Sequence, residues 1–258
     1  MISSCLGGDP NPRLLADPDI LFSLPQCEIV KDQRKIKVGR VQVEIGARIK
    51  GIYLKRYNAF SWRYRLCSLF ISSAAFRSWA GAGILIRAGF QTGEPIAAVE
   101  CRSWGMLTKS FYLAEEIPGG RTVDAHWREE LIPMTGSEGF RQRRNFLEAL
   151  AELFRSLHNL DIYHNDLKDA NILACAGDKP PGGPFYLLDL EGVRRFRHLN
   201  ERRRIKNLVQ LNRTLGTWLR STEKLYFLKA YLGNGLNHKE RRKWVRRILK
   251  RGRREDWC

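Results

Sequence analysis

The sequence lacks features that mark several common classes of protein. Its six cysteines have no CxxC or other zinc-like spacing, and so few cysteines in 258 residues do not suggest a disulfide framework. Residues 1–24 have neither a basic start nor a long apolar core, so no secretory signal is expected. The most apolar run, residues 66–76, is too short to span a bilayer. We therefore expect a cytoplasmic protein with reduced cysteines, whose contact with a membrane is at most peripheral.

Acidic residues are scarce in two long stretches. None lies between Glu44 and Glu94, and residues 194–254 hold three acids against 21 lysines and arginines. The whole chain has a formal net charge of +18. Such a field attracts polyanions, namely anionic lipid head groups, phosphorylated sugars or nucleic acid. A solvated helical surface that keeps the protein soluble is the simpler interpretation of the same residues.

The hydrophobic pattern predicts a mixed fold. Hydrophobic residues make up 43% of the chain, enough for a sizeable core. Residues 1–34 are rich in Pro, Gly and Asp and predict an irregular lead-in. From Lys35 onward, alternating β-branched residues punctuated by glycines predict two or three antiparallel strands. Residues 60–88 predict a helix that breaks at Gly81 or Gly83. Within it, the run 66–76 is expected to pack against the sheet, with contact to lipid as the alternative.

The second half of the chain is predominantly helical. Residues 96–100 and 110–117 predict two more strands, and the linker Pro118–Gly120 follows them. Residues 137–160 carry apolar side chains at helical spacing. We predict three regions: the lead-in at 1–34, a small β-rich lobe with one helix at 35–118, and a larger helical lobe at 119–258.

The most informative motif is YHNDLKDANIL at residues 163–173. It resembles the catalytic loop of kinases, H-R-D-L-x-x-x-N, with Asn165 in place of the arginine. A carboxylate at Asp166 can accept the proton of an attacking hydroxyl, while Asn171, five residues later, faces a metal ion. Lys168 is expected to contact the transferred phosphate. His164 is expected to have a structural role.

Two further residues fit the same chemistry. Asp189 follows an apolar strand in the segment Asp189–Gly192, which resembles the D-F-G segment with one extra residue. It is therefore the second candidate ligand for Mg²⁺. Lys55 ends a predicted strand and resembles the lysine that pairs with the α- and β-phosphates of ATP. Since no acid lies nearby in the chain, Glu94 or Glu100 could be its partner, or the ion pair is absent.

The nucleotide-binding residues have weaker signals. No G-x-G-x-x-G occurs, and the turn from Gly46 to Gly51 is the candidate phosphate loop. The hinge that meets adenine is expected at residues 114–117, where Glu116 is chosen by position alone.

Several segments occur in an order that resembles one family. They are IYLKRY, FRSWAGAGILIRAGFQTGEPIAAVE, YLAEEIPGG, HNDLKDANIL, LLDLEGVRRF, NLVQLNRTL and LYFLKAYL. Together they resemble the lipopolysaccharide kinase family, which contains the Kdo and heptose kinases of Gram-negative bacteria. The resemblance covers roughly residues 35–232.

This resemblance implies a two-lobed, protein-kinase-like α+β fold and the use of ATP and Mg²⁺. It also implies phosphorylation of an inner-core sugar hydroxyl at the cytoplasmic face of the inner membrane. The acceptor would be a lipid-linked anionic saccharide, and the protein would contact the anionic membrane surface peripherally. The missing A-P-E segment after Asp189 argues against a protein acceptor on a standard activation segment.

Three alternatives stay open. Another kinase of this fold could act on an aminoglycoside-like sugar or a protein, although the basic charge disfavours a cationic aminoglycoside. A non-catalytic pseudokinase could serve as a scaffold for anionic partners. A nucleic-acid-binding tail is disfavoured because its aromatic residues have the spacing of a helical core.

Overall fold

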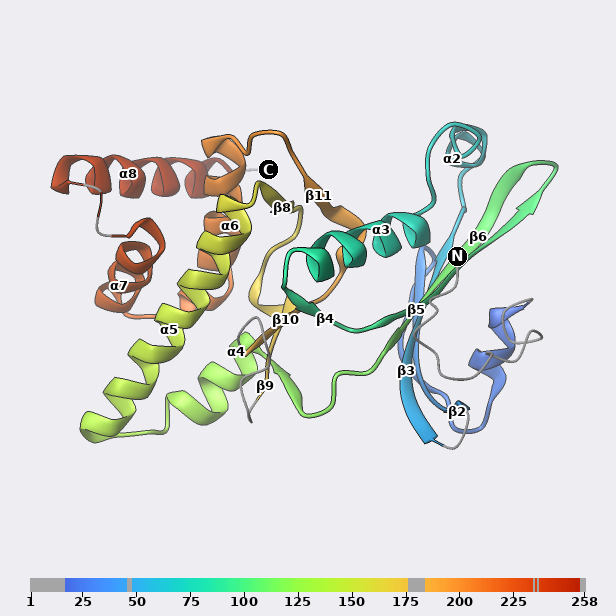
Figure 1. The fold of residues 1–258 in the computed structure, drawn as a ribbon, viewed down its shortest axis with the longest axis horizontal. Coiled ribbons are helices and arrows are strands. Elements are labelled where there is room, and N and C mark those ends of the chain that lie inside the picture. The colour runs from blue at the N-terminus through green and yellow to red at the C-terminus, as the bar shows by residue number, and fades with distance from the viewer. Residues whose placement is uncertain (1–16, 46–47, 176–183, 234, 236, 256–258) are drawn as a thin grey trace. The chain divides into compact units, whose positions relative to one another are not determined.

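The computed structural model describes residues 17–45, 48–175, 184–233, 235 and 237–255. The chain divides into two units, one formed by residues 1–83 and 92–118 and the other by residues 84–91 and 119–258. Figure 1 shows the elements of both units. The predicted region boundaries at residues 34 and 118 stay a prediction.

The first unit is a sheet with short helices. Its elements are the 3₁₀ helix η1 (Pro18–Ser23), β1 (Glu28–Asp32), β2 (Ile36–Ile45), β3 (Arg48–Asn58), α2 (Trp62–Cys67), most of α3 (Ala74–Arg87), β5 (Pro95–Ser103) and β6 (Met106–Glu115). Five strands pair in the order β1-β2-β3-β6-β5, and each pair is antiparallel. The predicted antiparallel strands are confirmed, as two strands between residues 36 and 58.

The sheet buries one apolar set beneath each face. On one face, Val41, Leu54 and Phe111 meet Leu21 of η1 in a cluster that excludes water. On the other face, Tyr57 and Tyr112 pack with the first turn of α3. Strand alternation separates the two sets, because Leu54 and Tyr57 differ by an odd number of positions.

The predicted helix at residues 60–88 breaks elsewhere than expected. Gly81 and Gly83 lie inside α3, so the prediction of a break at either of them is wrong. The break falls between α2 and α3, where the Ser68 hydroxyl donates to Arg65 O and accepts from Leu107 N at 2.9 Å. Ser73 then caps α3 by accepting from Phe76 N at 3.2 Å. Serine side chains that bond to the backbone compete with helix continuation, which explains the position of the break.

The second unit is mainly helical. Its elements are β7 (Gly120–Thr122), α4 (Val123–His126), the π-helical turn η2 (Trp127–Leu131), α5 (Gly136–Asn159), β8 (Ile162–His164), η3 (Asp169–Asn171), β9 (Ile172–Cys175), β10 (Phe185–Leu187), η4 (Leu190–Gly192), β11 (Val193–Arg195), α6 (Glu201–Arg213), η5 (Leu215–Thr217), α7 (Ser221–Leu232) and α8 (His238–Glu255). A small sheet has the order β4-β10-β9-β7, with β4 at Gln91–Thr92, and β8 pairs with β11.

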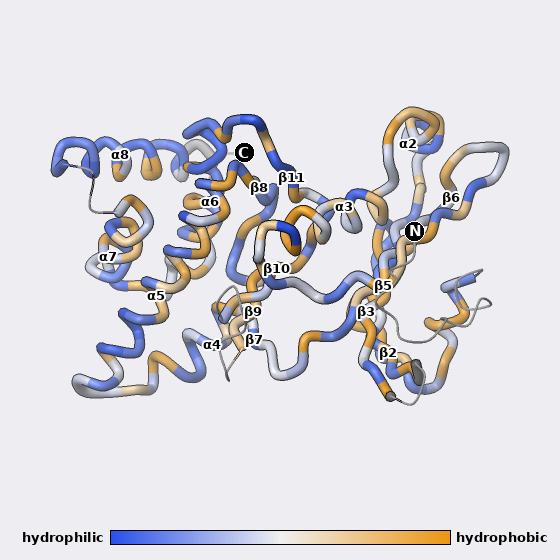
Figure 2. Tube along the Cα trace, in the orientation of Figure 1, coloured by the Kyte–Doolittle hydropathy of each residue, from blue (hydrophilic) through white to orange (hydrophobic). Residues whose placement is uncertain are grey.

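Helix α5 forms the core of this unit. The predicted helix at residues 137–160 is confirmed as Gly136–Asn159. Its buried side chains include Leu147, Leu150, Phe154 and Leu157, which recur at three- and four-residue intervals. Each fully buried side chain of this size stabilises the fold by roughly 1.5–3 kcal/mol. In contrast, α8 is hydrophilic along most of its length (Figure 2).

The mixed α+β class with an antiparallel sheet and several helices is confirmed. The lead-in prediction is wrong for residues 18–32, which contain η1 and β1 because Leu21 anchors that segment in the core. Four cysteines within the described residues, Cys27, Cys67, Cys101 and Cys175, are free thiols. Among the described residues, no helix combines the length and the apolar character needed to span a bilayer.

Candidate active site

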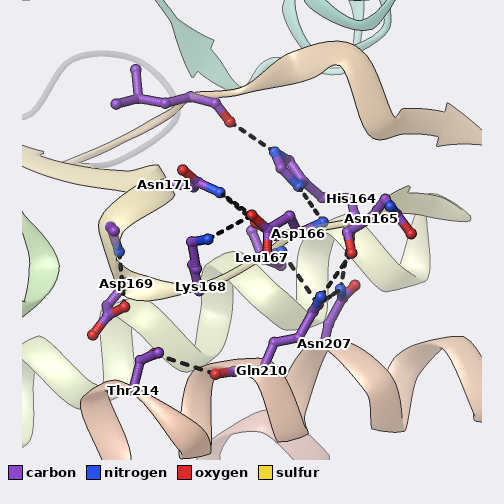
Figure 3. Close-up of polar contacts among 12 residues, drawn as sticks. His164, Asn165, Asp166, Leu167, Lys168, Asp169, Asn171, Asn207, Gln210 and Thr214 are labelled. Carbon is purple, nitrogen blue, oxygen red and sulfur yellow. Dashed lines mark hydrogen bonds and ion pairs between the residues drawn. The ribbon is translucent and has the colours of Figure 1, made fainter. Parts of the chain in front are cut away.

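The loop that contains Asp166 lies between β8 and η3 in the second unit (Figure 3). The Asp166 N–H donates to Nδ1 of His164 at 3.2 Å, and Nε2 of the same imidazole donates to Leu188 O at 2.8 Å. These contacts require the neutral tautomer with its proton on Nε2. Burial lowers the pKa of His164, which keeps the ring neutral. The imidazole therefore links the Asp166 loop to the segment before Asp189, in agreement with the structural role expected for it.

The Asp166 carboxylate is held by two donors. Its Oδ2 accepts from Nζ of Lys168 at 2.8 Å and from Nδ2 of Asn171 at 3.0 Å. Among the residues that the structure describes, Oδ1 receives no hydrogen bond, and the side chain is 41% exposed. An oriented carboxylate with one oxygen open to solvent can accept a proton from a hydroxyl group. Three of the predicted residues are thus brought together.

Asn171 has a defined orientation. Its Nδ2 donates to Asp166 O at 2.8 Å as well as to the Asp166 carboxylate, so both bonds of the amide nitrogen are made to Asp166. The amide oxygen points away from Asp166 (Figure 3). This is the atom with which an asparagine binds a hard cation.

Asp189 lies at a strained turn after β10. Its backbone is left-handed, with φ 55° and ψ 58°, a conformation that is uncommon for residues other than glycine. Leu188, the preceding residue, donates its N–H to Asn171 O at 2.9 Å. This bond places the two predicted metal ligands on neighbouring backbone segments. A strained residue at such a position is typical of a functional site.

Gly192 ends this turn and is required there. A Cβ at Gly192 would lie 2.6 Å from Cβ of Asn165, which no side chain tolerates without movement. The close approach lets the Asn165 N–H donate to Gly192 O at 3.2 Å. Two backbone hydrogen bonds therefore connect the Asp189 turn to the Asp166 loop, one from Leu188 before Asp189 and one to Gly192 after it.

The residues present fit a magnesium ion by the chemistry of their donors. The Asp189 carboxylate and the Asn171 amide oxygen are oxygen ligands, which Mg²⁺ prefers. The described parts of the chain contain no group of three or more His, Cys, Asp or Glu that could hold a metal ion. A kinase-type site needs no such group, because phosphate oxygens and water complete the coordination shell.

Sequence reasoning missed the residues beneath the loop. Gln210 of α6 donates from Nε2 to Asn165 O at 2.7 Å and accepts with Oε1 from Leu167 N at 3.3 Å (Figure 3). A single amide thus holds the peptide groups on both sides of Asp166. Asn207, one turn earlier on α6, is buried and donates to His164 O at 2.7 Å.

A buried histidine extends this network to other helices. His158 of α5 contacts Asn207 Oδ1 with Nε2 at 3.1 Å and the Tyr231 hydroxyl of α7 with Nδ1 at 2.8 Å. Burial lowers the pKa of His158 to about 4, which keeps the ring neutral. Because the Asn207 amide oxygen can only accept, Nε2 donates to it and Nδ1 accepts from the Tyr231 hydroxyl. The signal that could have identified this network is a polar residue at a core-facing position of an amphipathic helix, as with His158 in α5 and Asn207 in α6.

The predicted nucleotide-binding residues lie in the first unit. Lys55 is in β3, opposite Val38 and Tyr112, and its Nζ lies 5.1 Å from the ring centroid of Tyr57. Glu100, one of the two acids expected as its partner, pairs with Arg102 at 2.8 Å. The role of Lys55 in phosphate binding stays a prediction.

The predicted phosphate loop is only partly described. Gly46 lies outside the described residues, and the prediction of a turn reaching Gly51 is wrong because β3 begins at Arg48. A Cβ on Gly51 would lie 2.1 Å from Oε2 of Glu116, so this glycine makes room for that carboxylate. Glu116 in turn accepts from Nε of Arg40 at 2.8 Å. These contacts do not test a nucleotide-binding role for Gly51 or Glu116.

Comparisons with known proteins point to one family. The family model described as "Lipopolysaccharide kinase (Kdo/WaaP) family" matches residues 26–231. A search of the curated proteins found no match. Among solved structures, the chain is similar to one described as "WaaP in complex with acyl carrier protein", with 20% sequence identity and a TM-score of 0.67. The match covers 96% of this chain and 97% of that one, which shows a shared fold.

Proposed function

Because the chain belongs to the lipopolysaccharide kinase (Kdo/WaaP) family and is a kinase, we propose that it phosphorylates a sugar hydroxyl of the lipopolysaccharide inner core. Kinases of this family use ATP as the phosphate donor. The observation that carries the proposal is the Asp166 carboxylate with Lys168 and Asn171 bonded to it. Backbone hydrogen bonds connect this loop to the turn that contains Asp189.

In this proposal Asp166 is the general base. Its open Oδ1 accepts the proton of the sugar hydroxyl as that oxygen attacks the γ-phosphorus, and ADP leaves from the opposite side. Lys168 lies beside the same carboxylate, where its ammonium group offsets negative charge on the transferred phosphoryl group. Both groups belong to one short loop, so they approach the reacting atoms together.

Asn171 and Asp189 are proposed to hold Mg²⁺. A bound Mg²⁺ supplies positive charge that stabilises the phosphate oxygens during transfer. The Asn171 nitrogen already bonds to Asp166, which directs the oxygen outward as a ligand. Lys55, Gly46, Gly51 and Glu116 are proposed to bind ATP.

The charge of the chain supports an anionic, lipid-linked acceptor. Helix α8 alone carries ten lysines and arginines with two acids, and its Arg247 pairs with Glu201 of α6. Such a basic surface favours a phosphorylated or carboxylated saccharide and an anionic leaflet over a cationic substrate. We place the protein at the cytoplasmic face of the inner membrane.

Phosphate transfer to a truncated inner-core lipopolysaccharide tests the proposal. Wild type is incubated with radiolabelled ATP and Mg²⁺, beside Asp166→Asn and a control variant, Asp32→Asn. The Asp32 carboxylate belongs to the first unit, where it pairs with Lys37 of β2. We expect the transfer rate of Asp166→Asn to be about 10²–10⁴-fold lower than that of wild type, and the rate of the control to equal that of wild type. Chelation by EDTA should abolish transfer.

Other outcomes select among the alternatives. Wild type that binds ATP without modifying this acceptor would contradict the proposed substrate and favour another small molecule or a protein. A protein that does not turn over ATP would be a pseudokinase scaffold. Tight RNA or DNA binding that falls steeply with salt would revive the nucleic-acid interpretation of the basic helices.

A further inference from the structure

Seven large apolar side chains are exposed on one part of the first unit, which we call the α2 surface. They lie on α2, in the segments flanking it, and in the turn between β5 and β6: Phe60, Trp62, Leu66, Leu69, Phe70, Ile71 and Trp104. Phe70 and Trp104 are 89% and 94% exposed, and the others are between 46% and 69% exposed. The expectation that the run 66–76 packs against the sheet is therefore wrong for Leu66, Leu69, Phe70 and Ile71. It is confirmed for the end of the run, Ala74–Phe76, which packs with Tyr57 and Tyr112. Ser68 is buried within this stretch, and continuous burial begins at Ser73 and Ala74, where α3 starts.

The segments of the α2 surface are joined by hydrogen bonds. Arg102 donates to Ser68 O at 3.2 Å and to Gly105 O at 2.8 Å, so one guanidinium holds both the end of α2 and the hairpin turn. The Leu69 side chain lies 3.6 Å from the position of a Cβ on Gly105. These contacts hold the end of α2 beside the hairpin turn that carries Trp104.

The hairpin turn itself is unusual. Trp104 and Gly105 both have positive φ, 54° and 74°, as in a two-residue turn that normally contains Asn-Gly or Gly-Gly. A tryptophan in this conformation is strained, and its ring is not packed in a core. Neither turn geometry nor folding accounts for the residue, which points to a function for the exposed ring.

Cations lie against two of the aromatic rings. Arg34 and Lys35 lie 5.6 Å and 5.2 Å from the ring centroid of Phe60, and Arg63 lies 5.7 Å from that of Trp62. No acidic residue occurs between Glu44 and Glu94. Tryptophan, phenylalanine and arginine together are typical of segments that lie in the head-group region of a bilayer.

We infer that the α2 surface is the membrane-docking face of this kinase and that it binds the head-group region of an anionic bilayer. The inference rests on the proposed function, since a lipid-linked acceptor is presented at such a surface. Helix α2 contains no buried residue, so its apolar side chains are available to the interface. A second copy is disfavoured as the occupant, because two identical cationic faces repel each other.

Vesicle sedimentation tests this docking face. Wild type is mixed with vesicles of phosphatidylcholine containing roughly 30–40% phosphatidylglycerol, the charge at which basic peripheral segments respond, and with pure phosphatidylcholine. The variant is Phe70→Ser/Trp104→Ser. The control is Phe140→Ser, because that phenylalanine is also half-exposed and lies beneath an arginine, Arg144, at 5.5 Å, but belongs to α5.

We expect wild type and the control to bind the anionic vesicles, and the double variant to bind about tenfold more weakly. Brominated lipids should quench wild-type fluorescence more than that of the single variant Trp104→Phe. Equal vesicle binding by wild type and the double variant would overturn the inference. So would a concentration-dependent dimer, seen by light scattering, that the double substitution abolishes.

Transfer to a water-soluble, deacylated acceptor separates this inference from the proposed function. The double variant should retain that activity within about twofold, because its substitutions lie outside the catalytic loop. Wild type that phosphorylates the deacylated acceptor but does not bind anionic vesicles would contradict the docking face alone. Protein that binds vesicles through the α2 surface but transfers no phosphate would contradict the proposed function alone.

Discussion

The Asp166 loop and the α2 surface are both short stretches beside regular elements, but they are held in opposite ways. The loop is bonded to Asn207 and Gln210 of α6, and the peptide groups on both sides of Asp166 bond to Gln210. Asn207 in turn contacts the buried His158 imidazole of α5, which contacts the Tyr231 hydroxyl of α7. The α2 surface has a few hydrogen bonds at its base and leaves its apolar side chains in solvent. The contacts of the loop thus fix the position of the Asp166 side chain, whereas the α2 surface presents apolar side chains to a partner.

After Asp166→Asn, the largest effect is expected from Asp189→Asn, because it also acts directly on catalysis. It removes a charge from the proposed metal site while keeping the shape of the side chain and its left-handed backbone. We expect kcat to fall by about 10²–10³. Steady-state kinetics with varied Mg²⁺ would measure the loss, with Asp32→Asn as the control. Activity within threefold of wild type would remove Asp189 from the site.

Gln210→Met should have the next largest effect, and it tests the layer beneath the loop. The change keeps the size of the side chain but removes both bonds to the peptide groups around Asp166. A small displacement of a reacting group can cost up to about 100-fold, so we expect kcat to fall by about 10- to 100-fold.

The matched control for this change is Gln142→Met, which alters an exposed glutamine of α5. Circular dichroism at the assay temperature would verify that both variants are folded. If folded Gln210→Met has the kcat of the control, the layer does not position the loop.

Acidification should destabilise the loop's supporting network before it affects the α2 surface. The pKa of His158 is lowered to about 4, mainly by burial, with Arg204 acting in the same direction. Its unfolded pKa is about 6.5, so the unfolded state binds more protons between these values. Stability is therefore complete above pH 6.5 and falls as the pH drops toward 4.

By pH 5 this single histidine should cost about 2 kcal/mol of unfolding free energy. Urea unfolding at pH 7 and pH 5 would measure the loss. His158→Gln should show a smaller loss, and Phe70→Ser should show the wild-type loss. An identical pH dependence in His158→Gln and wild type would exclude His158 as the responsible group.

Trp104→Ala should have the smallest effect on stability. The ring is 94% exposed and the substitution removes no buried contact, so we expect a change within about 0.5 kcal/mol. Thermal unfolding would measure it. A loss of more than about 2 kcal/mol would show that the ring supports the fold, and the contrast between the two regions would fail.

The sequence alone identified the parts of the fold and the site that depend on local patterns. Alternation predicted the strands that became β2 and β3, and helical periodicity predicted α5 within one residue at each end. The spacing from Asp166 to Asn171 was sufficient to predict that they act together, because five residues on one loop cannot separate far. Asp189 was recognised from the apolar strand and glycine beside it.

Only the tertiary structure decided which distant groups meet. Gln210, Asn207 and His158 are separated from Asp166 by up to 44 residues, and nothing local shows that their amides and imidazole converge on its loop. The exposure of Leu66, Leu69, Phe70 and Ile71 likewise could not be predicted, since an apolar run has the same sequence whether it packs or faces solvent. Local periodicity determines secondary structure, whereas burial and long-range hydrogen bonding depend on how the elements pack together.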